Sequence, residues 1–346
     1  MNRLRYPAIA MSCLSALAAV VILVARPAAP AQAPRINLGT LAPRGSIFHQ
    51  ALQTMADQWR RAPGGGVRLV IYPDGTQGGE ADMVRLMRVG TLQAGLLTAV
   101  GLSEIEPGVA GLQNFPMAFR DFDEFDYVQE RLRPMMEKRL EEKGFMMLFW
   151  ADTGWVRYFF KEKTLTPAEM KKRKIFVWAG DNEQVAIMKE LGYNPIPLET
   201  ADVLTGLQTG LINAVPYPPI MAARSQFQTY APHMLDLKWG ILVGGLVIKK
   251  EAWDKLPQEA LASLREAARE AGKRIQTSAR KEAEDAVAAL EQRGLAVDRI
   301  TPAIEAEWRA EMDRLYPKIR GRIVPADIFD EVQRLLKEYR AGGGGR

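Results

Sequence analysis

Cysteine is almost absent from this sequence of 346 residues, which contains only one, Cys13. It lies in an apolar run from Ala8 to Ala25 that follows Arg3 and Arg5. A basic start, an apolar run and a small-residue cleavage site describe a secretory signal peptide. Removal of that leader would leave no cysteine, which would exclude disulfides, thiolate nucleophiles and cysteine-bound zinc from the mature protein.

The leader also predicts the compartment. Ala29-Pro-Ala31 offers a cleavage site after Ala31, whereas the second option, after Ala33, would leave Pro34 at the new N-terminus. We therefore expect residues 1–31 to be removed and the mature chain to reach the periplasm. A retained membrane anchor is the alternative, because the apolar run would span roughly 27 Å as a helix, near the lower limit for a membrane crossing.

Histidine is scarce as well, since only His49 and His233 occur. A histidine-rich zinc site is therefore excluded. The sequence has no Gly-x-Ser-x-Gly elbow, and no Gly-x-Gly-x-x-Gly or phosphate-binding loop follows an expected strand. Acidic pairs such as Glu141-Glu142 lie on a charged helix and are expected to be solvated. We expect no enzyme activity, metal or cofactor, because catalysis needs a positioned base or nucleophile.

A large excess of charge is missing too. The formal net charge is +5, but three of the 46 basic residues, Arg3, Arg5 and Arg26, fall in the leader, which has no acids. The 43 basic and 41 acidic residues that remain nearly balance, which argues against a nucleic-acid partner. The basic run Lys171-Lys-Arg-Lys174 has no interleaved aromatics and is expected to be a solvated turn.

What the chain does have is a regular alternation of strand and helix patterns. Strands are expected at 35–41, 67–72, 94–100, 145–150 and 175–178, and helices at 46–61, 80–89, 122–143 and 182–191. This alternation predicts an α/β fold with mostly parallel sheets. A helix pattern over 257–293 would be roughly 55 Å long and could tie two lobes together, with a bend at Gly272. Further helices are expected at 302–319 and 327–339.

An internal echo indicates that the two lobes are similar. Val89-Gly-Thr-Leu-Gln-Ala94 and Thr209-Gly-Leu-Ile-Asn-Ala214 both place glycine at the end of an expected helix and alanine inside the following strand. Glycine supplies the left-handed cap from which the chain turns back into the sheet. Two such units are expected of a pseudo-repeat.

Five pieces of the mature chain follow one another in a specific order: Tyr72-Pro-Asp-Gly-Thr-Gln-Gly-Gly-Glu80, Asn114-Phe-Pro-Met-Ala-Phe-Arg120, the strand Lys174–Val177, Asn194-Pro-Ile-Pro197 and Thr205-Gly-Leu-Gln-Thr-Gly210. Their order and spacing resemble the solute-binding component of tripartite ATP-independent periplasmic (TRAP) transporters, the DctP type. The likeness covers nearly the whole mature chain. It implies a two-lobed periplasmic-binding-protein fold with a long helix spanning both lobes, a small-molecule ligand trapped between the lobes, and delivery to TRAP membrane subunits.

The resemblance divides the chain into parts. After the signal peptide, 1–31, lobe I is expected to comprise 32–157 plus about 240–275. Lobe II is expected to comprise 158–239 plus about 276–340, and 341–346 should be a flexible tail. The C-terminal helices are amphipathic, which leaves a homodimer open.

Departures from the family pattern bear on the ligand. Where the family carries an arginine whose guanidinium pairs with the ligand carboxylate, this chain has Phe176. Asp-Gly-x-Glu-Asn becomes Asn213-Ala-Val-Pro-Tyr217, and a usual phenylalanine is Thr200. Because burial of an anion without a charge partner is costly, these changes predict a largely apolar or amphiphilic ligand. They resemble a divergent branch, associated with a tetratricopeptide-repeat partner, that is thought to handle hydrophobic ligands.

Near these positions, one arginine of the family pattern is retained. Gly154-Trp-Val-Arg157 resembles the family's Gly-x-Arg with one residue inserted, so Arg157 could meet a carboxylate or form only an interlobe salt bridge. The residues expected to bind ligand are Phe176, Trp178, Tyr217, Arg157, Trp155, Asp152, Gln77 and Thr200. Two alternatives stay open: a TRAP receptor for an organic acid or dicarboxylate clamped by Arg157, and a periplasmic lipid-carrier or sensory receptor not coupled to transport.

Overall fold

The computed structural model describes residues 33–343. The expected signal peptide, 1–31, and the last three residues of the expected tail lie outside the described residues. From Ala33 onward the chain forms one compact unit. Within the described range, no helix has the length and apolarity needed to cross a membrane.

The first half of the fold alternates strands and helices, as the sequence predicts. Its elements are β1 (Arg35–Thr40), α1 (Ile47–Arg60), β2 (Arg68–Tyr72), α2 (Glu80–Arg88), β3 (Ala94–Thr98), α3 (Ala99–Ser103), the 3-10 helix η1 (Pro107–Ala110) and α4 (Phe122–Glu142). β1 lies between β2 and β3 and is parallel to both. Ser46 caps α1, and the apolar face of that helix is buried through Phe48, Leu52, Met55 and Trp59.

The second half repeats the alternation and ends in helices. Its elements are β4 (Phe145–Phe160), α5 (Pro167–Met170), β5 (Lys174–Trp178), α6 (Asn182–Glu190), β6 (Asn194–Leu198), η2 (Thr200–Asp202), α7 (Val203–Thr209), β7 (Ala214–Tyr217), α8 (Pro219–Arg224), η3 (Phe227–Thr229), β8 (His233–Leu235), β9 (Gly240–Lys249), α9 (Lys250–Asp254), α10 (Leu261–Gln292), β10 (Ala296–Asp298), α11 (Pro302–Ile319) and α12 (Ala326–Ala341).

Two long strands join the two halves. The strand order in the described chain is β2-β1-β3-β9-β4-β7-β5-β6, and β9 is antiparallel to both β3 and β4. β4 runs on to Phe160, ten residues beyond the strand expected at 145–150. Its register with β9 shifts between Asp152 and Trp155, and Gly154 has a φ of +81°. The strand expected at 145–150 therefore continues through an irregular point at residues 152–155 and remains one strand.

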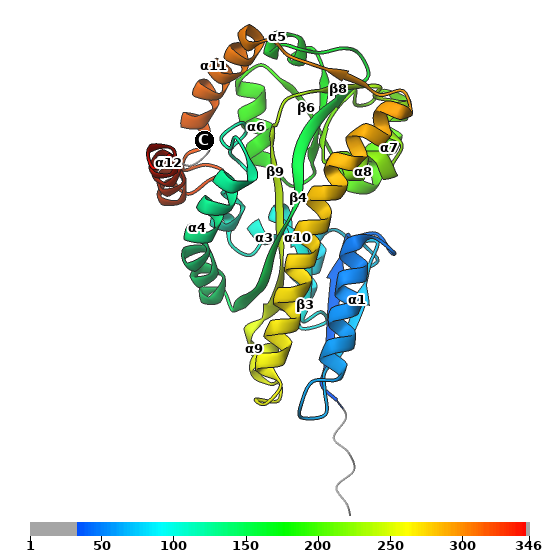
Figure 1. Cartoon of the computed structure of the whole chain (residues 1–346), viewed down its shortest axis with the longest axis vertical. Helices are drawn as coiled ribbons and strands as arrows, with labels where there is room; N and C mark the ends of the chain where they lie inside the picture. The colour runs from blue at the N-terminus through cyan, green and yellow to red at the C-terminus, as the bar shows by residue number, and fades with distance from the viewer. Residues whose placement is uncertain (1–32, 344–346) are drawn as a thin grey trace, which may run out of the picture. The chain divides into compact units, whose positions relative to one another are not determined.

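The long helix expected from the sequence is confirmed as α10, which lies along β4 and beside α1 (Figure 1). Gly272 does not interrupt it. A Cβ atom at Gly272 would lie only 2.6 Å from the Cβ of Phe149 on β4. The glycine therefore allows close approach of the helix to the strand, which explains its place in a helix interior better than a bend does.

Gly272→Ala is consequently expected to destabilise the protein by about 1–3 kcal/mol, because the added methyl group overpacks the contact with Phe149. In an unhindered helix the same change would stabilise by about 1 kcal/mol. Urea unfolding measures the difference in free energy. Lys273→Ala, at the exposed neighbouring position, is the control and should change little. A stabilised Gly272→Ala protein would contradict the close packing.

The last helix belongs with the first half of the sheet. α12 packs against α4, and the ring of Phe329 stacks on that of Phe115 with centroids 4.9 Å apart. The boundary expected from the sequence, with 276–340 in lobe II, stays a prediction, although α12 packs against a helix of the first half. α11 does contact α5 and α6 of the second half.

Candidate ligand-binding site

Four neighbouring strands of the second half bring one residue each to the same level. Arg157 on β4 lies opposite Tyr217 on β7, and Trp178 on β5 lies opposite Leu198 on β6. Continuing the parallel register of β5 and β7 places Trp178 opposite Tyr217. Residues directly opposite each other point to the same face of a sheet. Arg157, Tyr217, Trp178 and Leu198 therefore form one row, called the edge row below.

The edge row lies where three strands end. Tyr217, Trp178 and Leu198 are the last residues of β7, β5 and β6, which run parallel to one another. Open α/β sheets bind ligands at the carboxyl ends of their parallel strands. Thr200 begins η2 just beyond Leu198, and the side chain of Asp181 accepts a hydrogen bond from the Gln184 N–H as the cap of α6.

The middle of the edge row is aromatic. The rings of Trp178 and Tyr217 are nearly parallel, with an interplanar angle of 14° and centroids 6.4 Å apart. Trp178 is half-buried and Tyr217 is buried. Burial raises the pKa of Tyr217 to about 12, so its hydroxyl group stays neutral at physiological pH and can donate a hydrogen bond.

Arg157 supplies a cation at one end of the edge row. Its side chain is only 16% exposed, and its Nη1 lies 3.4 Å from Oδ1 of Asp236, whose side chain is 43% exposed. Burial lowers the pKa of Arg157, but a guanidinium keeps its charge in proteins. Asp236 follows β8 of the second half, so this ion pair does not bridge the two halves, unlike the interlobe salt bridge considered from sequence. The guanidinium group of Arg157 is largely desolvated and makes only a long ion pair with Asp236, so it is suited to bind a carboxylate ligand.

Phe176, which the sequence predicted to contact the ligand, lies deeper in the sheet than the edge row. It is opposite Ile196, two residues before the edge row, and its side chain has 0% exposure. Its ring packs edge-on against Trp178 with centroids 4.9 Å apart. Phe176 therefore supports Trp178 from within the core, and its direct contact with a ligand stays a prediction. Arginine at this position would place an unpaired charge among apolar neighbours.

Two expected site residues lie away from the edge row, around the irregular point of β4. The side chain of Asp152 has 0% exposure and is held by Arg280 of α10, with Nη2 2.8 Å from Oδ2. Arg280 also pairs with Asp126 of α4 at 2.6 Å. Trp155 is buried, with its ring 5.3 Å from that of Phe122. Asp152 is thus held in a structural ion pair, and its contact with a ligand stays a prediction.

Gln77 and Thr200 lie on segments that approach each other from the two halves. Gln77 is half-buried in the turn between β2 and α2, and Thr200 is half-buried at the start of η2. A Cβ atom at Gly79 would lie 3.7 Å from Oε2 of Glu199. The turn of the first half therefore faces the end of the edge row. Sequence reasoning missed Leu198 and Glu199, because neither has a distinctive pattern.

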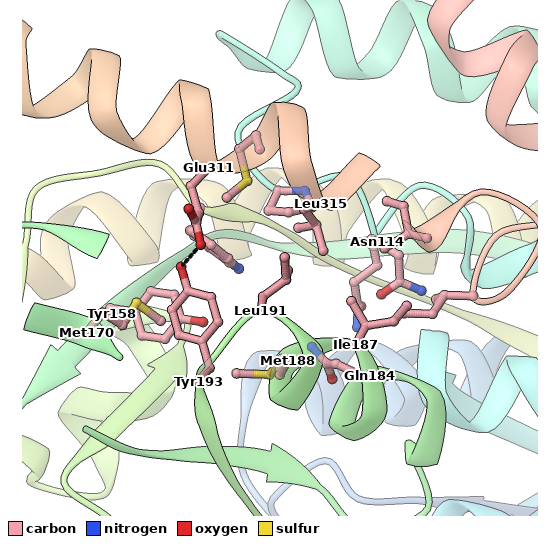
Figure 2. A pocket seen from close by; sticks show the side chains of 16 residues that line it. Asn114, Tyr158, Met170, Gln184, Ile187, Met188, Leu191, Tyr193, Glu311 and Leu315 are labelled. Atoms are coloured by element: carbon pink, nitrogen blue, oxygen red, sulfur yellow. Dashed lines mark hydrogen bonds between the residues drawn. The ribbon is translucent and has the colours of Figure 1, made fainter. Parts of the chain in front are cut away.

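A cavity of about 90 Å³ lies on the opposite face of the sheet, since Tyr158 lines it and adjacent strand residues point to opposite faces. Figure 2 shows Tyr193 pointing to Glu311, with 3.1 Å between the hydroxyl and Oε1. Glu311 is buried and pairs with Lys171 at 2.7 Å. The lining residues are Gln113, Asn114, Pro116, Tyr158, Met170, Gln184, Ile187, Met188, Leu191, Tyr193, Trp239, Glu311, Met312, Leu315, Ile319 and Ile323.

That cavity is a poorer candidate for an anionic ligand than the edge row. Its lining residues include no lysine or arginine, and its one ionisable acid, Glu311, would repel an anion. The edge row has a cation, a neutral donor and aromatic surface together. Within residues 33–343, no group of three or more histidine, cysteine or acidic side chains is placed to hold a metal ion.

Comparison with known proteins gives the fold and site a context. The profile of bacterial extracellular solute-binding protein, family 7 (DctP), matches residues 38–321. The 2,3-diketo-L-gulonate-binding periplasmic protein YiaO of Escherichia coli is 27% identical over 226 residues, which is 65% of this chain and 68% of that protein.

Solved structures of similar proteins share the fold. DctP7 of Bordetella pertussis, an extracytoplasmic solute receptor binding pyroglutamic acid, has a TM-score of 0.78 at 20% identity, covering 88% of this chain and 100% of that one. A TRAP periplasmic solute-binding protein of Chromohalobacter salexigens with bound D-glucuronate has a TM-score of 0.78 at 19% identity, covering 87% and 99%. The expected two-lobed α/β fold is therefore confirmed.

Proposed function

The chain belongs to bacterial extracellular solute-binding protein family 7, the DctP family, and from that premise we propose that its edge row captures an organic acid by a single carboxylate for a TRAP-type transporter. As a member of this family it is a solute-binding receptor. Its work is therefore capture and delivery of a small molecule, and we propose no catalytic step. The family and the leader expected in the sequence both support a periplasmic location.

The observation that carries this proposal is the state of Arg157. It is a largely desolvated cation on the residue opposite Tyr217 in the sheet, and its one ion-pair partner among the described residues, Asp236, is half-exposed and 3.4 Å away. One guanidinium fork matches one carboxylate. The family's usual arginine position is occupied by Phe176 in the core, so Arg157 is the cation of this site.

The similar proteins support an acid rather than a largely apolar compound. The names of the three relatives described above specify 2,3-diketo-L-gulonate, pyroglutamic acid and D-glucuronate, each an organic acid with one carboxyl group. The largely apolar ligand expected from the sequence finds no support among them. An acid with an apolar portion agrees with both the charge of Arg157 and the aromatic surface of Trp178 and Tyr217.

Binding would occur by closure of the two halves around the ligand, a hinge motion in which the ligand selects the closed state. β4 and β9 cross between the halves, and the irregular point at Gly154 gives β4 a place to bend. The turn holding Gln77 and the segment holding Thr200 would then close over the edge row. Both residues remain proposed ligand contacts.

We also propose the finer assignment made from the sequence. Phe176 in place of the family's arginine supports the divergent branch associated with a tetratricopeptide-repeat partner. Pull-down from the periplasm with the receptor as bait tests that partner, and recovery of TRAP membrane subunits without any tetratricopeptide-repeat protein would contradict it. A homodimer through the amphipathic C-terminal helices remains a prediction that sedimentation can check.

Calorimetric titration of the receptor tests the function directly. Pyroglutamate, D-glucuronate, benzoate and phenylacetate are each titrated together with the corresponding methyl ester. Because the ester cannot pair with Arg157 as an anion, we expect every acid that binds to lose at least about thirtyfold in affinity on esterification. An ester that binds as tightly as its acid would contradict capture by a carboxylate.

A further inference from the structure

We propose that the acid captured at the edge row carries a flat aromatic ring, which stacks on Trp178 and Tyr217. This inference rests on the proposed function, and it specifies the class of substrate. The two rings are within 14° of parallel, and Trp178 is the half-buried member of the pair, so a flat ring that stacks on Trp178 lies nearly parallel to Tyr217 as well. An aliphatic body would gain burial of apolar area there, but not the geometry of stacking.

The order of residues along the edge row matches such a molecule. Arg157, Tyr217 and Trp178 occupy three successive strands, and neighbouring strands are spaced roughly 5 Å apart. A carboxylate on Arg157 therefore places a ring joined by a short linker over Tyr217. A second fused ring would extend toward Trp178.

The surroundings fix the aromatic surface in place. Phe176 packs edge-on beneath Trp178, with centroids 4.9 Å apart, and Phe227 packs against Tyr217 at 5.2 Å. Both supporting side chains are buried. Because these contacts restrain the two rings before ligand arrives, stacking costs little side-chain entropy.

The far end of the edge row disfavours a second anionic group. Glu199 follows Leu198 directly and is exposed, and Asp236 lies beside Arg157 at the other end. Three strand spacings of roughly 5 Å separate Arg157 from Glu199, so a long diacid bound through Arg157 would bring its second carboxylate toward a like charge. The far end of the row therefore disfavours an extended diacid and accepts an uncharged ring.

Phenylacetate and cyclohexylacetate form the deciding pair of ligands. They share the carboxylate and linker, but only phenylacetate has a flat ring, and cyclohexylacetate is at least as apolar. Benzoate with cyclohexanecarboxylate, and indole-3-acetate as a two-ring acid, complete the panel. Calorimetry is expected to show that at least one aromatic acid binds, and that it binds roughly tenfold more tightly than its saturated counterpart.

Variants of Trp178 assign the preference to the edge row. Trp178→Leu keeps an apolar side chain and should reduce the ratio of aromatic to saturated affinity to near one. Trp178→Phe keeps a ring and should preserve most of the ratio. Thermal unfolding of both variants confirms that they fold, and an unchanged ratio in Trp178→Leu overturns the stacking role.

The remaining outcomes separate this inference from the proposed function. If aromatic and saturated acids bind with equal affinity and their esters bind weakly, the inference of an aromatic ring is overturned, but the proposed capture of a carboxylate stands. Esters that bind as well as acids overturn both. Binding of D-glucuronate or pyroglutamate without binding of any aromatic acid in the panel also overturns the ring alone.

Discussion

Replacement of Arg280 by methionine is expected to lower the free energy of unfolding by about 3–5 kcal/mol, because it leaves the carboxylate of Asp152 buried without its partner. The Asp152 side chain has 0% exposure, and Arg280 contacts it through Nη2 at 2.8 Å and through Nε at 3.1 Å. Arg280 also holds Asp126 at 2.6 Å. Burial of Arg280 disfavours its charge, but the hydrogen bonds to Asp126 and Asp152 outweigh this effect and raise its pKa.

An ion pair on the protein surface serves as the control that shows whether the effect of Arg280→Met comes from burial of the pair or from loss of the charge alone. Arg269 on the same helix pairs with Glu266, and their side chains are 63% and 53% exposed. Arg269→Met should therefore change the free energy of unfolding by less than about 1 kcal/mol. Urea unfolding measures both variants. If Arg280→Met lost no more free energy of unfolding than Arg269→Met, Asp152 would not be held as the structure indicates.

A double variant that combines Arg280→Met with Asp152→Asn tests the same ion pair by removing both charges. If Asp152 is destabilising only when unpaired, Asp152→Asn should restore part of the stability lost in Arg280→Met. The network ties α10 to β4 at its irregular point and to α4. Asp152 therefore helps to fix β4 where this strand passes from one half of the fold to the other.

Arg157→Met is expected to weaken binding of the carboxylate ligand by about 2–5 kcal/mol, which is at least roughly thirtyfold in affinity. The reason is that Arg157 is the cation of the edge row and is largely desolvated, with 16% of its side chain exposed. Arg157→Lys keeps the charge but loses the planar fork, so an intermediate loss is expected. Calorimetry with the tightest acid of the panel measures both.

Asp236→Asn is the matched control for Arg157. It removes the competing carboxylate 3.4 Å from the guanidinium and is expected to leave ligand affinity unchanged or higher. If Arg157 served only as a structural ion-pair partner, Asp236→Asn would lower ligand affinity as much as Arg157→Met does. Wild-type affinity in a folded Arg157→Met protein would remove this residue from the site.

Local patterns predicted most of the fold. A capping residue and apolar spacing located α1, and nearly unbroken helical patterns located α10 and α11, because those signals lie within or directly beside each helix. β4 was cut short because Gly154 and the polar residues before it are typical of a strand end. The packing of α12 against α4 was not predicted, because the two helices lie far apart in sequence.

The candidate site was only partly accessible from sequence. Alternation along β5 correctly places Phe176 and Trp178 on one face, but it does not show which of them lies at the strand end and which in the core. The pairing of Asp152 with Arg280 spans 128 residues and leaves no local signal. The edge row itself needs the register of four strands, which no single segment contains.

Native mass spectrometry of receptor purified from the extracytoplasmic fraction, with extraction of the bound compound, tests the central claim most directly. The account predicts an organic acid with one carboxyl group that is retained by the wild-type protein and lost from Arg157→Met. A bound compound without a carboxyl group, or one retained equally by Arg157→Met, would contradict it.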